Sequence, residues 1–183
     1  MLRIVPLVAS LQEHLDRLAR QPQDYRPAGC PKCGLARPWG HGHYDRKTAR
    51  ATGCVNPVPV SRFVCGRKGG CGATCSTLPS YLPPRRHYLW SVQMAVLVCL
   101  LSGTSLRKCA DTLGCILGPS RSTLRRWWRW LQARHSLFSF HLLNHEPQWG
   151  RAMDWTDFWR RALSQEPLRE LMAYLDSQGL IVP

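Results

Sequence analysis

Acidic residues are scarce in this sequence. It has 11 Asp and Glu against 25 Lys and Arg in 183 residues, and its formal net charge is +14. Such a surplus repels itself unless a polyanion lies nearby. Nucleic acid is the commonest polyanion for so basic a chain, although a ribosome or an anionic membrane surface would also serve. We therefore expect nucleic acid as the partner.

Long apolar runs are absent too. The longest, Val92–Leu101, contains Gln93 and ends at Ser102, well short of the roughly 20 residues that span a bilayer. Residues 1–10 have one arginine and a short apolar run broken by Pro6, without the length and cleavage pattern of a signal peptide. These absences predict a cytoplasmic protein that does not enter a membrane.

The nine cysteines do not suit a disulfide framework, because their number is odd and a reducing compartment keeps thiols free. Clustered cysteines then indicate metal binding. Glycine, proline and cysteine dominate residues 30–84, where helical periodicity is missing, and helical patterns return from residue 85. The expected fold class is α+β: a small β zinc ribbon followed by an all-α helix-turn-helix module, with a short N-terminal helix.

Composition divides the chain into an N-terminal helix and linker (1–29), the zinc ribbon (30–84), the helix-turn-helix module (85–136) and a helical tail (137–183). Ser10 and Glu13 form a capping box before leucines at helical spacing, which predicts a helix to about Arg20. Prolines make residues 21–29 a linker. Strands are predicted over Trp39–Arg46 and Val58–Val64, and further helices over Leu89–Leu101, Ser105–Leu113, Ser120–Ser136 and Pro167–Gln178.

The segment Cys30-Pro-Lys-Cys33-Gly34 has the form of a zinc knuckle, in which a tight turn places two thiolates on one ion. Cys71 precedes Gly72 just as Cys33 precedes Gly34, and Cys65 follows the second predicted strand. Five residues separate Cys65 from Cys71, but three of them are glycines, which makes the long loop feasible. We predict one structural Zn²⁺ on four ligands, namely Cys30, Cys33, Cys65 and Cys71.

Other uses of these residues stay open. Cys71 and Cys75 have three residues between them, which fits the usual ligand spacing better. His41 and His43 are alternative ligands, although their strand favours a position facing solvent or DNA. A thioredoxin-type redox use of the first cysteine pair needs a preceding strand and a following helix, which this segment lacks. The remaining cysteines are predicted to be small apolar packing residues: Cys54, Cys99, Cys109 and Cys115.

A helix-turn-helix is indicated by residues 105–136. The helix predicted over Ser105–Leu113 carries Ala110, and Gly114 follows four residues later. A small residue suits a close helix crossing, and the glycine suits the turn after it. Ser120 is a suitable cap for the second helix. The intervening segment, Cys115–Pro119, is longer than the usual turn of three or four residues.

The second helix of this pair has the pattern of a recognition helix. Arg121, Arg125 and Arg129 recur at four-residue spacing, away from the apolar stripe formed by Leu124, Trp127, Trp128 and Leu131. Arginine can contact guanine edges or phosphates. A solvated basic face on an ordinary helix is the alternative. The predicted DNA-contacting residues are Lys108, Ser120, Arg121, Ser122, Thr123, Arg125, Arg126 and Arg129.

These pieces resemble the amino-terminal part of bacterial insertion-sequence transposases and related small transposase-like proteins, in which a zinc ribbon precedes a helix-turn-helix. The matching segments are Cys30-Pro-Lys-Cys33-Gly34, Gly40-His-Gly-His-Tyr44, Arg62-Phe-Val-Cys65, Cys71-Gly-Ala-Thr-Cys75, Pro84-Arg-Arg-His-Tyr88 and Ser120-Arg-Ser-Thr-Leu-Arg-Arg-Trp127. The resemblance implies binding of double-stranded DNA at the bacterial nucleoid, for transposon-end recognition or regulation. An aromatic residue usually stands where this chain has Cys75, which implies a core role for Cys75.

Members of that family that cut DNA carry an acidic triad on a ribonuclease-H-like domain. Only 52 residues follow Leu131, which leaves no room for such a domain. Asp154 and Asp157 are better explained by helix capping or an ion pair with Arg160. The prediction is a non-catalytic, zinc-stabilised DNA-binding protein whose tail packs on the helices, forms a homodimer or binds a transposase subunit. The alternatives are a protein-interaction adaptor and a subunit of a metal-dependent transposase.

Overall fold

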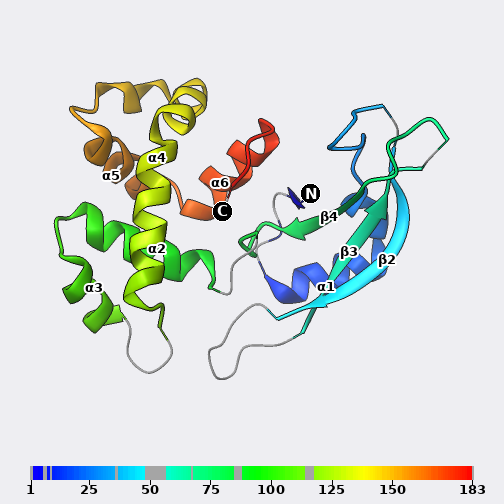
Figure 1. The fold of residues 1–183 in the computed structure, drawn as a ribbon, viewed down its shortest axis with the longest axis horizontal. Helices are drawn as coiled ribbons and strands as arrows, with labels where there is room; N and C mark the ends of the chain where they lie inside the picture. The colour runs from blue at the N-terminus through cyan, green and yellow to red at the C-terminus, as the bar shows by residue number, and fades with distance from the viewer. Residues whose placement is uncertain are drawn as a thin grey trace. The chain divides into compact units, whose positions relative to one another are not determined.

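The computed structural model describes residues 2–5, 8, 10–35, 37–47, 57–66, 68–84, 88–113 and 118–182. The chain forms two compact units, residues 1–87 and residues 88–182, with Pro183 grouped with the first. Each unit is described by itself, and Figure 1 labels their elements. The mixed α/β content agrees with the predicted α+β class.

The first unit is built on a four-stranded sheet (Figure 1). Its strands are β1 (Leu2–Val5), β2 (Trp39–Arg46), β3 (Val58–Val64) and β4 (Thr74–Pro79), in the order β1-β4-β3-β2. β1 is parallel to β4, and the other neighbours are antiparallel. β2 and β3 have the predicted bounds, whereas β1 and β4 were not predicted.

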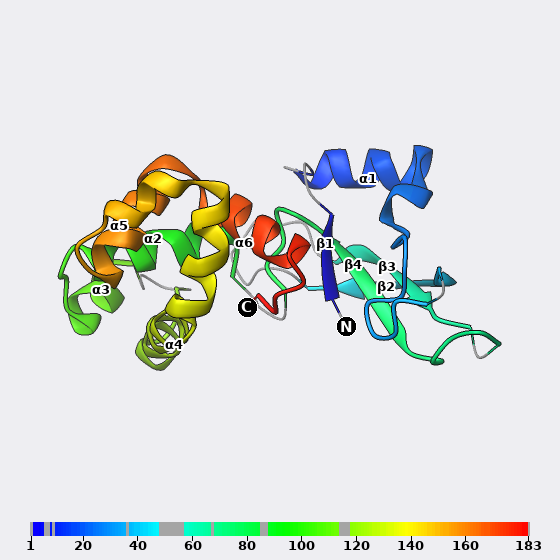
Figure 2. The same ribbon diagram turned by 90° about the horizontal axis from the view of Figure 1, so that it is seen from above.

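Helix α1 (Leu11–Arg20) lies over one face of this sheet, as the second view shows (Figure 2). Its capping box is confirmed, because the Ser10 hydroxyl accepts a hydrogen bond from the Glu13 N–H at 3.2 Å. Residues 21–29, predicted as a linker, also contain a short ordered turn that packs on the sheet. A 3₁₀ turn, Pro22–Tyr25, buries Tyr25 completely, and the Thr77 hydroxyl donates to the Tyr25 carbonyl at 2.9 Å.

A buried histidine joins α1 to the sheet. The ring of His14 is fully buried, with Nε2 2.7 Å from the Pro59 carbonyl and Nδ1 2.6 Å from the Tyr25 hydroxyl. The carbonyl can only accept, so Nε2 carries the proton and Nδ1 accepts from the hydroxyl. Burial lowers the pKa of His14 and raises the pKa of Tyr25 to about 12.

Acidification is expected to weaken the first unit through His14. Because burial lowers the pKa of His14 below its ordinary value of 6.5, the unfolded chain binds this proton more readily than the folded chain. The contribution of the neutral ring is complete above that value and is lost as the pH falls through the folded pKa. The test is the unfolding free energy of zinc-loaded wild type minus that of His14→Gln, from pH 7 to pH 5. This difference should shrink, and a constant difference would contradict the assignment.

The second unit is helical in its described part. Its elements are α2 (Trp90–Leu101), α3 (Leu106–Leu113), α4 (Arg121–His145), the 3₁₀ turn Pro147–Arg151, α5 (Trp155–Gln165) and α6 (Leu168–Ser177). α2 is apolar on all sides, which is the pattern of a central helix, and it contacts α3, α4, α5 and α6. None of the described helices is both long and apolar enough to cross a bilayer.

Two features of this unit differ from the sequence prediction. α4 continues to His145 rather than ending near Ser136, because Phe138 and Leu142 extend its buried stripe and no proline occurs before Pro147. The predicted boundary between residues 136 and 137 therefore falls inside a helix. α5 was not predicted as a helix.

Asp154 and Asp157, at the start of α5, have the capping and ion-pair roles that the sequence favoured. Asp154 caps the helix and accepts from the N–H groups of Thr156 and Asp157 at 2.8 Å. The Asp157 carboxylate lies 2.9 Å from Arg161 and 4.0 Å from Arg160. Hydrogen bonds from the Thr156 hydroxyl and the Asp157 N–H lower the pKa of Asp154. Hydrogen bonds from the Met153 N–H and the Arg161 guanidinium lower the pKa of Asp157.

Candidate metal centre

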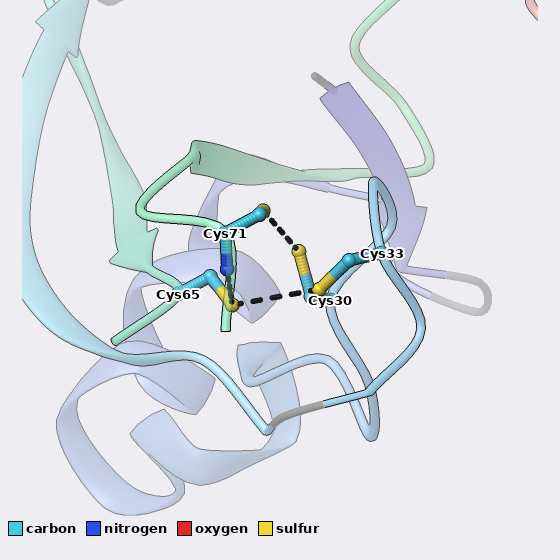
Figure 3. Close-up of side chains that lie close together, drawn as sticks. All are labelled: Cys30, Cys33, Cys65 and Cys71. Atoms are coloured by element: carbon cyan, nitrogen blue, oxygen red, sulfur yellow. Dashed lines mark hydrogen bonds between the residues drawn. The ribbon is translucent and has the colours of Figure 1, made fainter. Parts of the chain in front are cut away.

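Four cysteine sulfurs lie together at one end of the sheet. The Sγ atoms of Cys30, Cys33, Cys65 and Cys71 are all within 4.8 Å of one another, and Figure 3 shows the four side chains around a common centre. The separation is 3.7 Å between Cys30 and Cys71 and 3.8 Å between Cys33 and Cys65. These distances exceed the roughly 2.05 Å of a disulfide. They match the edges of about 3.8 Å in a tetrahedron with metal–sulfur bonds of about 2.3 Å.

The first pair of sulfurs belongs to the turn before β2. The Gly34 N–H donates to the Cys30 carbonyl at 2.8 Å, and the Lys32 N–H approaches the Cys30 sulfur at 3.4 Å. Gly34 has a φ of 71°, a left-handed conformation that L side chains rarely adopt. The backbone itself therefore turns back on the sulfur, as the C-x₂-C-G pattern predicts.

The second pair comes from the loop between β3 and β4. Cys65 directly follows β3, and its N–H donates to the Ala73 carbonyl at 2.8 Å, which closes the loop. The Cys71 N–H approaches the Cys65 sulfur at 3.3 Å. Gly72 has a φ of 68°, close to that of Gly34. The two halves of the cluster thus share a left-handed glycine directly after their second cysteine, despite the five residues between Cys65 and Cys71.

The pKa values of the clustered thiols are shifted in opposite directions. Backbone N–H groups of Cys33 and Lys32 lower the pKa of the Cys30 thiol to about 6, which favours its thiolate form. Although the Cys71 N–H acts in the opposite direction, burial and the neighbouring thiols raise the pKa of Cys65 to about 11. Without a cation, thiolates this close repel each other. A divalent metal removes that repulsion, and its binding releases protons.

Gly34 offers a direct test of the turn geometry. A Cβ at Gly34 would meet no atom within 4 Å, so Gly34→Ala adds only backbone strain at positive φ. We expect this variant to lose about 1 kcal/mol of unfolding free energy for the zinc-loaded protein, measured by urea titration. Gly40→Ala is the control, because its Cβ is equally unobstructed but its φ is not in the left-handed region. Equal losses in the two variants would contradict the explanation.

The other candidate ligands lie outside the cluster. Cys75 is buried on β4 against Tyr25 and Phe63, in the core role that the resemblance implies. His41 and His43 are exposed on β2, as expected. Cys109 is buried, which raises the pKa of its thiol to about 12, and Cys99 is partly exposed. Cys54 and Cys115 lie outside the described residues.

The predicted DNA-contacting residues occupy two helices of the second unit. Lys108 is exposed on α3, and Ser120 caps α4 by accepting from the Thr123 N–H at 3.4 Å. Ser122 is exposed, and the Thr123 hydroxyl lies 3.1 Å from that of Ser120. Four exposed arginines follow, and we call them the arginine face: Arg121, Arg125, Arg126 and Arg129. The turn predicted at Cys115–Pro119 falls mostly outside the described residues.

Sequence reasoning missed one interaction beside the cluster. The Arg26 guanidinium lies 5.0 Å from the centre of the Trp39 ring, and the Arg26 Nε donates to the Pro38 carbonyl at 2.6 Å. Twelve residues lie between Arg26 and Trp39, and Arg26 lies in the segment predicted as a linker. Its tryptophan partner could therefore not be found from the sequence pattern.

The chain thus combines a candidate four-cysteine metal site, at the end of a small sheet, with a second unit that is helical in its described part. Residues 30–127 match a family described as a domain of unknown function (DUF6431). The match covers more than half of the chain and includes all four clustered cysteines and the start of α4. The chain belongs to this family. No curated protein and no solved structure matches it.

Proposed function

We propose that this protein binds double-stranded DNA through the arginine face of α4, with one structural Zn²⁺ stabilising the first unit. The observation that carries the proposal is the charge of α4. This helix of 25 residues contains five arginines and no aspartate or glutamate. Its exposed side can therefore offer only cationic and neutral groups to a partner.

The position of the arginines along α4 supports an anionic partner. Arg121, Arg125 and Arg126 lie in the first two turns, where the helix dipole already places a partial positive charge. A basic side chain there costs stability, by about 0.3–1 kcal/mol in the first turn, unless an anion is present. A phosphate backbone removes this cost and also meets the N-terminal N–H groups of the helix.

The packing of α4 leaves the arginine face open. Leu124, Trp127 and Leu131 are buried and hold the helix to its unit, on a different side from the arginines. Within the part of the chain that the structure describes, no carboxylate pairs with the arginine face. Other arginines of this unit do have such partners, for example the exposed Arg161 with Asp157 and the half-buried Arg169 with Glu170, both at 2.9 Å.

The metal is proposed to be structural Zn²⁺. Four thiolates in tetrahedral arrangement suit zinc, and they leave no ligand position open for a water or substrate. The ion would be held by Cys30 and Cys33 from one turn and by Cys65 and Cys71 from the other. It would fix the end of the β2–β3–β4 sheet.

A transposon-type role, in end recognition or regulation at the nucleoid, rests on the resemblance of the ribbon and helix segments to transposase amino-terminal parts. α3 and α4 contact each other and would form the helix-turn-helix pair, with α4 as the recognition helix. A titration of labelled duplex DNA at low salt tests the binding itself. The adaptor alternative predicts no duplex affinity in that titration.

A further inference from the structure

A β-bulge places two aromatic residues on one face of the first unit. In the β2–β3 ladder, Trp39 pairs with Val64 and Tyr44 pairs with Val60, and the register shifts by one residue between Gly40 and His43. Directly paired residues share a face, and Val60 and Val64 share a face of β3 because they are four residues apart. Without the bulge, Trp39 and Tyr44 would lie on opposite faces. The extra residue is accommodated at Gly42, whose φ is 73°.

Val58 and Val60 are buried on this face, whose exposed side chains are the two rings and an arginine between them. Arg62 lies midway between Val60 and Val64 on β3 and is exposed. Trp39 is 64% exposed and Tyr44 is 38% exposed. The paired positions lie about 13 Å apart along β3, from four residues at about 3.3 Å each. Each ring can therefore stack on its own base.

The Trp39 ring is held in place before any ligand binds. The Arg26 guanidinium lies over it at 5.0 Å from the ring centre, and Arg26 is itself fixed by its hydrogen bond to the Pro38 carbonyl. A Cβ on Gly66 would lie 3.7 Å from the edge of the indole, so the backbone there lines that edge. A ring fixed in this way loses little conformational entropy when a base stacks on it.

The charge of the first unit suits an anionic strand. Residues 1–87 contain 14 Lys and Arg against four Asp and Glu. Three of the four acids, Glu13, Asp16 and Asp24, belong to α1 and the turn after it. The fourth, Asp45, neighbours Tyr44 on β2 and therefore points to the opposite face.

We propose that the face formed by Trp39, Arg62 and Tyr44 binds single-stranded DNA, with bases stacked on the two rings and a phosphate near the arginine. Exposed rings fit unpaired bases, because base faces are covered inside a duplex. The choice of DNA over RNA rests on the proposed function of α4. The two binding surfaces are otherwise independent.

The test measures binding of labelled oligo(dT) to the full-length, zinc-loaded chain. Trp39→Ala and Tyr44→Ala should each weaken binding by about 5- to 150-fold, which corresponds to the loss of one base–aromatic stack. Trp39→Phe and Tyr44→Phe keep a ring and should bind within about twofold of wild type. Leu35→Ala, which removes a side chain that is 83% exposed in the same unit, should change nothing. Equal zinc content in all variants shows that the site is folded.

Three results would overturn the proposal. The first is equal affinity of the alanine and phenylalanine variants, which would remove stacking from the explanation. The second is loss of oligo(dT) binding in Arg121→Glu/Arg125→Glu, which would assign it to α4. The third is tighter binding of oligo(U) RNA than of oligo(dT). If the wild type binds oligo(dT) but not duplex DNA, the proposed function of α4 is contradicted and the proposal for the Trp39 face is not.

Discussion

Stripping the metal from the four-cysteine site is expected to unfold residues 1–87 and leave residues 88–182 folded. A structural zinc site contributes on the order of 10–16 kcal/mol at pH 7, whereas a whole domain is stable by only about 5–15 kcal/mol. The cysteine turns join β2, β3 and β4, so their release frees one end of the sheet. Hydrogen exchange before and after chelation measures this, and re-addition of zinc should restore protection. Unchanged protection in a metal-free first unit would contradict the prediction.

Single substitutions identify the ligands. Cys33→Ala and Cys65→Ala should each lose the one zinc ion per chain that native mass spectrometry should find in wild type. Cys75→Ala is the matched control, because Cys75 is a buried cysteine of the same unit that lies outside the sulfur cluster. It should keep its zinc. Zinc loss in Cys75→Ala together with retention in Cys65→Ala would show that the other ligand set is correct.

Reversing two charges of the arginine face is expected to weaken duplex binding by at least about 30-fold. The variant is Arg121→Glu/Arg125→Glu, and each arginine is assigned about 1–3 kcal/mol from a base or phosphate contact. Both side chains are exposed and fill no core, so the helix should stay folded. Circular dichroism checks the fold, and fluorescence anisotropy with labelled duplex measures the affinity.

A matched control distinguishes DNA binding by the arginine face from DNA binding by the net charge of the chain. Arg134→Glu/Arg151→Glu makes the same change of charge within the same unit, at exposed positions outside the arginine face. It should weaken binding far less. If the two double variants bind equally poorly, the arginine face has no special role and the net charge of the chain accounts for the binding.

Parts of the fold that depend on local signals could be predicted from the sequence. The alternation of Val58, Val60 and Val64 and the capping residue Ser10 act over a few positions, and the elements that they mark have the expected bounds or starts. β1 and β4 lack such signals. β1 has only four residues and forms by pairing with β4 more than 70 residues later, which is a tertiary effect.

The candidate site shows the same division. The knuckle of Cys30 and Cys33 follows from spacing, and the glycine after Cys71 correctly favoured Cys65 and Cys71 over Cys75 as the residues that come together. The face that carries Trp39 and Tyr44 could not be predicted, because strict alternation puts these residues on opposite sides of the strand. Only the observed bulge brings them to one side.

The salt dependence of duplex affinity for the zinc-loaded wild type tests the central claim most directly. Each phosphate contacted by a lysine or arginine should contribute about −0.9 to the slope of log affinity against log salt. Four arginines on one face of α4 therefore predict a slope of about −3 to −4. Arg121→Glu/Arg125→Glu should reduce its size by about two. Absence of duplex binding at low salt, or a slope near zero, would contradict the account.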